Sequence, residues 1–112
     1  MAVLKPKRGE VWWVRFDPTK GSESQKTRPA IVVSNNSSNR YLDRIQVVPL
    51  TSNIKNVHPS ECLVSVKGQV CKAMADQLRT ISCVRLGKKV TALSSGDLVS
   101  VNQTLKLQLD LL

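Results

Sequence analysis

The chain has 112 residues, which suffices for one domain with one hydrophobic core and is too short for two. Lysine and arginine number 17 against 8 aspartates and glutamates, a net charge of +9, so nucleic acid is the expected partner. No stretch is apolar enough for a membrane span or a signal peptide, and three cysteines without C-x-x-C spacing argue against disulfides and zinc. We therefore expect a soluble, cytoplasmic protein that holds no metal or cofactor.

The first predicted elements are a basic tail and an aromatic strand. Residues 1–8 form the tail, which we expect to be mobile, and the strand begins near Glu10. Residues 10–16 read Glu-Val-Trp-Trp-Val-Arg-Phe and hold three of the four aromatic side chains of the chain. Because apolar residues occupy both faces, we expect this strand to lie at the centre of a small barrel or to be partly covered by a partner chain.

A polar segment then leads into a buried strand. Residues 18–27 show no hydrophobic periodicity and are predicted to be a long hairpin connection, a kind of loop that is often functional. It ends at Arg28-Pro29, and residues 30–33 are a purely apolar strand. Pro29 fixes its own φ and favours an extended Arg28, so the guanidinium should be held at the mouth of the core.

The middle of the chain alternates between polar segments and short apolar runs. Residues 34–39 are the most turn-like segment, and residues 40–43 are expected to form one helical turn. The next strand covers residues 44–50, and its Pro49 suits a sheet edge or a strand end because proline has no N–H to donate. After a loop, we predict a strand at 61–66, two short strands in 69–81 split by Asp76-Gln77, a helical turn at 82–86 and a strand at 88–93.

The C-terminal segment carries two competing periodicities. Residues 105–111 alternate strictly, as in a strand, whereas Leu98, Val101, Leu105, Leu109 and Leu112 fall on one helical face. We predict a helix, because Ser94 and Asp97 resemble a capping box and residues 98–112 contain neither glycine nor proline.

The chain lacks most of the usual catalytic groups. His58 is its one histidine and lies in a predicted loop, and we interpret Cys62, Cys71 and Cys83 as fillers of the core or near-surface. What remains is Arg28 at the start of one strand and Thr51-Ser52 at the end of another. These groups meet at one rim of the fold if the two strands are antiparallel neighbours.

Such a pair suits the cleavage of RNA, in which the 2′-hydroxyl attacks the adjacent phosphorus and no outside nucleophile is needed. The protein then has to align the reacting atoms and stabilise the negative charge of the transition state. The guanidinium of Arg28 matches phosphate oxygens, and the Thr51 hydroxyl adds a donor. Because an arginine rarely gives up its proton, Arg28 is assigned to charge stabilisation and not to proton removal.

Four sequence blocks together resemble those of a known family. They are Asp-Pro-Thr-Lys-Gly-Ser-Glu at 17–23, Arg-Pro-Ala-Ile-Val-Val-Ser at 28–34, Val-Pro-Leu-Thr-Ser at 48–52 and Ala-Asp-Gln-Leu-Arg-Thr-Ile at 75–81. Their order and spacing resemble the MazF/PemK (Kid) toxins, with MazF the most similar branch. The resemblance implies a mainly β protein with short helices, an SH3-like (PemK/CcdB-like) β-barrel followed by a C-terminal α-helix. It also implies a homodimer without cofactors.

The resemblance further implies the toxin of a type II toxin-antitoxin system, a metal-independent endoribonuclease (mRNA interferase). The substrate would be single-stranded mRNA, cut at short sequences to leave a 2′,3′-cyclic or 3′-phosphate and a 5′-hydroxyl. A cognate antitoxin peptide would cover the groove.

Carried over by position, Arg28 and Thr51 become the catalytic pair, and Glu23 matches an acidic residue that close relatives need. The residues implied to contact RNA are Lys20, Ser22, Lys26, Thr27, Ser52, Asn53, Asp76, Gln77 and Arg79. Asp76 has a catalytic part in some relatives, but that branch carries an arginine where this chain has Met74, so Asp76 is expected to bind substrate here.

Two other functions remain open at this point. One is a non-catalytic basic barrel that binds nucleic acid, since SH3-like barrels host many functions. The other is a CcdB-like toxin that inhibits gyrase through protein contact.

Overall fold

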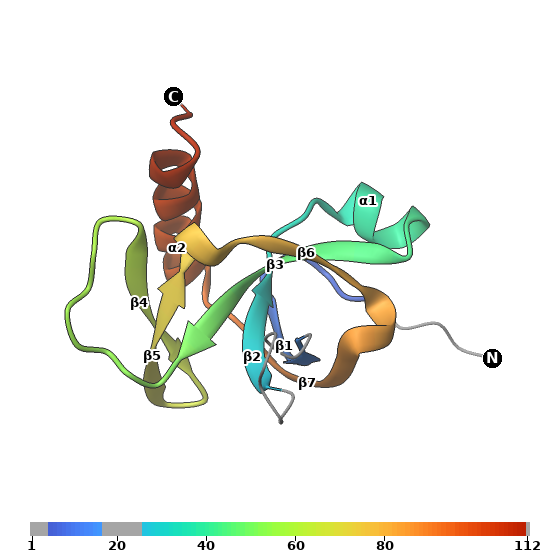
Figure 1. Cartoon of the computed structure of the whole chain (residues 1–112), viewed down its shortest axis with the longest axis horizontal. Coiled ribbons are helices and arrows are strands. Elements are labelled where there is room, and N and C mark those ends of the chain that lie inside the picture. The colour runs from blue at the N-terminus through green and yellow to red at the C-terminus, as the bar shows by residue number, and fades with distance from the viewer. Residues whose placement is uncertain (1–4, 17–25, 112) are drawn as a thin grey trace, which may run out of the picture.

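A computed structural model describes residues 5–16 and 26–111. The elements are, in order, β1 (Glu10–Arg15), β2 (Thr27–Val32), α1 (Asn36–Tyr41), β3 (Arg44–Thr51), β4 (Glu61–Val66), β5 (Gln69–Met74), the 3-10 turn η1 (Ala75–Gln77), β6 (Arg79–Ser82), the 3-10 turn η2 (Cys83–Arg85), β7 (Leu86–Ala92) and α2 (Ser95–Gln108). The strands form one antiparallel sheet in the order β4-β5-β3-β2-β1-β7, with β6 also paired to β3 (Figure 1). The sheet curls into a half-barrel, and α2 packs on β4, which confirms the expected fold class.

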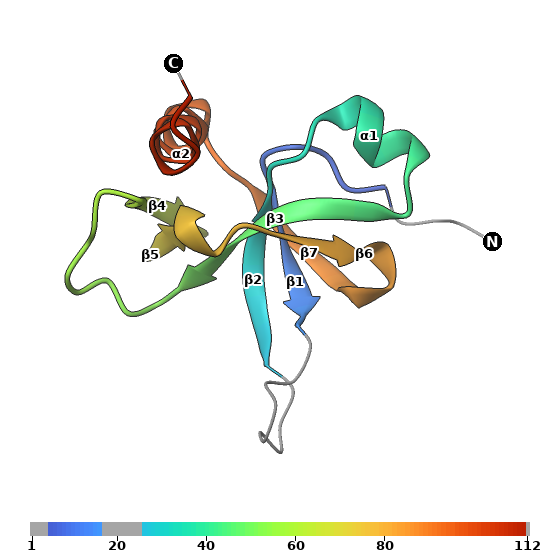
Figure 2. The same ribbon diagram turned by 45° about the horizontal axis from the view of Figure 1, so that its top comes forward.

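The long strand β3 joins the two halves of the curled sheet. One of its edges pairs with β2, while the other pairs first with β6, at residues 44–47, and then with β5, at residues 50–51 (Figure 2). Pro49 lies between these two partners. The prediction that Pro49 marks a sheet edge or a strand end is wrong, because Pro49 lies inside a central strand. Its missing N–H is nevertheless tolerated, because the pairs with β6 end at Val47 and the pairs with β5 begin at Leu50.

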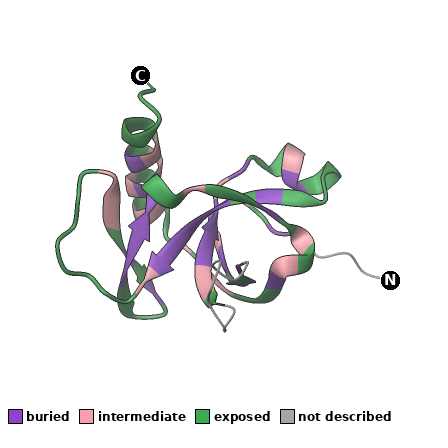
Figure 3. Ribbon diagram, in the orientation of Figure 1, coloured by how far each residue is buried: buried purple, intermediate pink, exposed green. Residues whose placement is uncertain are grey.

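Alternate residues of the central strands enter two separate cores. Val11, Ile31 and Val48 belong to the core under α2, which Val101 closes from the helix. Residues that alternate with these on β1, β2 and β3 form a second core together with Phe16, Ile81 of β6 and Leu86 of β7. The members from the three strands are Trp12, Val14, Ala30, Val32, Ile45 and Val47. Figure 3 shows the buried segments running along β2, β3 and β5. The prediction that the aromatic strand is central and apolar on both faces is therefore confirmed.

The helix α1 is where the predicted local structure is wrong. Residues 34–39 were expected to be a turn and residues 40–43 a helical turn, but one short helix covers Asn36–Tyr41. Asn35 caps it by accepting a hydrogen bond from Ser38 N at 2.8 Å. The buried Asn39 side chain donates to Ser34 O at 2.9 Å. The same polar residues that favour turns thus serve here as a cap and as a buried anchor.

The C-terminal helix begins as predicted, with Ser94 Oγ accepting from Asp97 N at 3.1 Å. Asp97 also accepts from Ser65 N at 2.8 Å, which ties the start of α2 to β4. Of the predicted apolar face, Val101 is buried, whereas Leu109 lies past the helix end and is 50% exposed. Leu112 lies outside the described residues. No helix in the described part of the chain is long and apolar enough to cross a membrane.

The segment before β1, predicted to be a mobile tail, is attached to the fold from residue 5 onward. Pro6 is buried, and Lys5 Nζ donates to Arg40 O at 2.7 Å. Arg8 donates from Nε to Val33 O at 2.9 Å and from Nη2 to Asn102 Oδ1 at 2.6 Å. Basic side chains therefore join this segment to α1 and α2.

Candidate active site

β2 and β3 are antiparallel neighbours, as the predicted meeting of Arg28 and Thr51 requires. The register pairs Ala30 with Pro49, Ile31 with Val48 and Val32 with Val47. Arg28 and Thr51 each lie two residues beyond the last of these pairs, where the start of β2 and the end of β3 diverge (Figure 2). Side chains alternate along a strand, so both residues share the face of the second core, at the point where that core ends. Both are only partly buried, as a substrate contact requires.

The Thr51 hydroxyl is oriented by the loop that follows it. Its Oγ1 accepts a hydrogen bond from Asn53 N at 3.2 Å. The Asn53 side chain in turn accepts from Lys55 N, also at 3.2 Å. Because Oγ1 acts as the acceptor in the first contact, its hydrogen remains available to donate to a phosphate oxygen. Ser52 and Asn53 are exposed beside it.

A second arginine lies on the same face, on β6. Arg79 pairs with Val47 in the β3–β6 ladder, and its guanidinium carbon lies 5.1 Å from the centre of the Phe16 ring. A guanidinium stacked on an aromatic ring keeps its charge and loses conformational freedom. This part of the sheet thus offers two positively charged side chains, Arg28 and Arg79, on one face.

Asp76 and Gln77 lie on η1, which links β5 to β6 and packs against β3 and α2. Both side chains are exposed, and Gln77 Nε2 contacts Met74 Sδ at 3.4 Å. Met74 itself is buried, so its thioether lies inside the fold.

Other predicted RNA contacts fall in different places. Thr27 pairs with Arg15 and therefore faces away from Arg28, toward a pocket of about 230 Å³ that also includes Trp13 and Arg85. Lys26 is exposed at the start of β2. Lys20, Ser22 and Glu23 lie outside the described residues.

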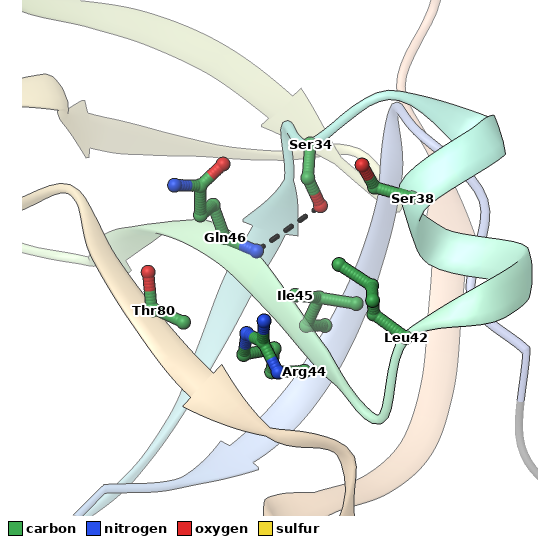
Figure 4. Close-up of a pocket in the computed structure, with 7 residues that line it drawn as sticks. All are labelled: Ser34, Ser38, Leu42, Arg44, Ile45, Gln46 and Thr80. Carbon is green, nitrogen blue, oxygen red and sulfur yellow. Dashed lines mark hydrogen bonds between the residues drawn. The ribbon is translucent and has the colours of Figure 1, made fainter.

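A further pocket, of about 210 Å³, lies at the opposite end of β3 from Thr51 (Figure 4). Ser34 Oγ on its wall accepts from Gln46 N at 3.0 Å. The remaining lining residues are Ser38, Leu42, Arg44, Ile45 and Thr80. This pocket brings together no nucleophile and base, and it is separate from the site of Arg28 and Thr51.

Cysteine and histidine chemistry has little support in the described residues. Burial raises the pKa of Cys62, Cys71 and Cys83, so each thiol is a poor nucleophile at neutral pH. His58 is exposed in the loop between β3 and β4. No three histidines, cysteines or acidic residues within 5–16 and 26–111 lie close enough together to hold a metal ion.

Sequence reasoning missed Lys72, which pairs with Thr51 across the β3–β5 ladder. The feature of the sequence that could have revealed it is a charged residue inside the apolar run 70–75. Lys72 is buried and forms an ion pair with Glu61, with Nζ and Oε1 3.5 Å apart. The pKa of Glu61 is lowered, first because its carboxylate accepts the His58 N–H and then because the Lys72 ammonium is close, with partial burial acting against both.

Comparison with solved structures identifies proteins that share this half-barrel with a terminal helix. MazF from Deinococcus radiodurans superposes with a TM-score of 0.81 at 26% identity, over 96% of this chain and 99% of that one. An endoribonuclease from a mycobacterial species, solved with its cognate antitoxin, has a TM-score of 0.80 at 22% identity, over 96% and 97%.

Sequence comparison identifies the family. The profile of the PemK-like, MazF-like toxins of type II toxin-antitoxin systems matches residues 7–109. The endoribonuclease MazF9 of Mycobacterium tuberculosis is 44% identical over 114 aligned positions, which cover 94% of this chain and 97% of that protein. The endoribonuclease toxin MazF of Escherichia coli is 39% identical over 77, covering 69% and 68%. The chain belongs to the PemK-like, MazF-like toxin family.

Proposed function

We propose that this protein is the toxin of a type II toxin-antitoxin pair and acts as an endoribonuclease on single-stranded RNA, with cytoplasmic mRNA as its target. The family match and the relatives named endoribonucleases support the activity. The observation that supports the proposal in this chain is the antiparallel pairing of β2 with β3, which puts Arg28 and Thr51 on the same face of the sheet, two residues beyond the last pair of the ladder.

The proposed reaction uses the RNA's own nucleophile. The 2′-hydroxyl loses its proton as its oxygen bonds to the adjacent phosphorus, the bond from phosphorus to the 5′-oxygen breaks, and the 5′-oxygen receives a proton. The products are a 2′,3′-cyclic phosphate, which water can open to a 3′-phosphate, and a 5′-hydroxyl. Arg28 stabilises the charge on the non-bridging oxygens, and Thr51 donates a hydrogen bond to the same phosphate. Neither step draws on a metal ion.

The other predicted residues keep roles that depend on their position. Glu23, by its match to the family, is proposed as an acidic group of the site. Ser52, Asn53 and Arg79 are proposed to contact RNA near the reacting phosphate. Asp76 and Gln77, on η1, are proposed to bind nucleotides beyond the cleaved bond. Lys20, Ser22 and Lys26 are proposed to contact RNA from the β1–β2 connection, whereas Thr27, on the other face of the sheet from Arg28, is given no contact with the reacting phosphate.

A test of the activity compares RNA with DNA of the same sequence. Incubated with a mixed-sequence single-stranded transcript in EDTA, the protein should cut the RNA and leave the matching DNA intact, because deoxyribose has no 2′-hydroxyl. Mapping of the new 5′ ends should show hydroxyl termini at a recurrent short sequence. RNA that stays intact but is bound would favour the non-catalytic barrel, and gyrase inhibition without RNA cleavage would favour the CcdB-like alternative.

The proposed partners include a second copy of the chain and an antitoxin. Apolar side chains exposed on β1 and η2, Trp13 and Val84, and near the end of α2, Leu107, Leu109 and Leu111, support a homodimer. Sedimentation equilibrium at micromolar concentration should therefore give twice the chain mass of 12.4 kDa. A mass of one chain at every concentration would contradict the dimer. Relatives solved with their cognate antitoxins support an antitoxin that covers the RNA groove.

A further inference from the structure

Lys72 has a buried ammonium group that contacts Glu61, the first residue of β4, and Lys55 in the loop between β3 and β4. Its side chain is 10% exposed, and that of Glu61 is 9% exposed. Nζ lies 3.5 Å from Glu61 Oε1 and donates to Lys55 O at 3.0 Å. Glu61 Oε1 also accepts from His58 N at 2.9 Å. A buried charge is stable only when it is paired and hydrogen-bonded, so these contacts hold the loop in one arrangement.

Two further hydrogen bonds connect the Lys72 contacts to the Thr51 hydroxyl. Lys55, whose carbonyl oxygen Lys72 holds, donates its N–H to the Asn53 side chain. Asn53 donates its own N–H to Thr51 Oγ1. The strand register independently pairs Lys72 with Thr51. The β5 lysine and the proposed catalytic threonine are thus connected twice, through the ladder and through the loop.

The loop has few other contacts to fix its shape. Residues 52–59 are all exposed, as the green loop beside β4 in Figure 3 shows. Asn56, next to Lys55, has a φ of 56°, a left-handed conformation that the surrounding contacts have to maintain. Without the Lys72 contacts, the N–H of Asn53 would no longer be held against the Thr51 oxygen. The hydroxyl would then rotate among several directions.

We propose that Lys72 is a positioning residue that orients the Thr51 hydroxyl through Lys55 and Asn53. The inference rests on the proposed ribonuclease function and adds to it a residue that never touches the RNA. With its side chain buried and committed to Glu61 and Lys55, Lys72 is not a phosphate ligand. Its effect should therefore appear in kcat, where alignment matters, and not in KM.

A double-mutant cycle with Thr51→Val tests this role. The substrate is a labelled RNA oligonucleotide that contains the cleavage site mapped for the wild-type protein, and cleavage is followed in single turnovers. Lys72→Met should lower the maximal single-turnover rate by about 10-fold to 100-fold. The concentration at which half of that rate is reached should stay within about 2-fold of the wild-type value. In the Thr51→Val background, the same change should lower the rate by less than about 3-fold, because the group it positions is gone.

Two further variants separate positioning from general effects. Lys89→Met removes another lysine–glutamate ion pair, in which Nζ of Lys89 on β7 lies 2.9 Å from Oε2 of Glu10 on β1. This change should leave the cleavage rate unchanged. Lys72→Arg retains a donor and a positive charge and should restore part of the loss. If Lys72→Met does not fold by circular dichroism, Glu61→Gln takes its place in the cycle, because it removes the paired charge and keeps the acceptor for His58.

The outcomes distinguish this inference from the function on which it rests. A wild-type rate in Lys72→Met, or an equal loss with and without Thr51→Val, would overturn the positioning role. A variant that keeps the wild-type maximal rate and changes only the concentration at which half of that rate is reached would overturn the positioning role as well. RNA left uncut by the wild-type protein would instead overturn the proposed function.

Discussion

Replacing Arg28 with alanine is expected to lower the rate of RNA cleavage by at least about 100-fold to 1,000-fold, the usual cost of losing one preorganised donor to a developing charge. The Arg28 guanidinium matches phosphate oxygens, and it lies on the same face of neighbouring strands as the Thr51 hydroxyl. Since Arg28 is only partly buried at the start of β2, the fold should survive the change.

The matched control for Arg28→Ala is Arg15→Ala. Arg15 is exposed on the neighbouring strand β1 and pairs with Thr27, so it points to the opposite face of the sheet. Its loss removes the same net charge and should change the single-turnover rate by less than about 3-fold, with at most a modest effect on binding. Equal rates for Arg28→Ala and wild type, or equal losses in both variants, would show that the reacting phosphate does not lie at Arg28.

Replacing Ile31 with alanine is expected to have the largest effect on stability, about 2–5 kcal/mol in the free energy of unfolding. Ile31 has no exposed surface and lies three residues beyond Arg28 on the same strand, between Val11 of β1 and Val48 of β3. The cavity would open in the middle of the core under α2, where strands on either side limit collapse. Urea unfolding at one fixed protein concentration measures the loss.

Ile54→Ala is the control for Ile31→Ala, because it makes the same change at a side chain that is 42% exposed in the β3–β4 loop. Its unfolding free energy should stay within about 0.5 kcal/mol of wild type. A loss of that small size for Ile31→Ala as well would mean that the central strands do not pack as described. The Arg28 variant thus tests catalysis and the Ile31 variant tests folding, although both residues lie on the same strand.

Much of the fold could be predicted from local sequence because the signals were local. The strands of β1 to β3 follow from apolar runs bounded by polar segments, and the start of α2 follows from Ser94 and Asp97, whose cap is made within a single turn. The segment of α1 was predicted wrongly because its structure depends on contacts that local sequence does not show. Serine and asparagine favour turns in isolation, and only the burial of Asn39 against Ser34 selects a helix there.

The candidate site also has residues that local sequence could predict and one that it could not. Arg28 and Thr51 were recognisable because each stands where an apolar strand meets a polar loop, and their meeting required only that the two strands be antiparallel neighbours. Thr27 was grouped with them by proximity in sequence, yet the alternation of side chains turns it toward the other face.

By itself the sequence determined a small, basic, mainly β chain with a capped terminal helix, and it marked Arg28 and Thr51, because these features depend on residue type and on spacing over a few positions. The tertiary structure alone decided that β3 exchanges β6 for β5 along one edge, which makes room for Pro49. It alone joined Lys72 to Thr51 through Lys55 and Asn53. The contact between Lys72 and Lys55 links residues that are far apart in the chain, and its energy depends on burial and pairing that no local pattern encodes.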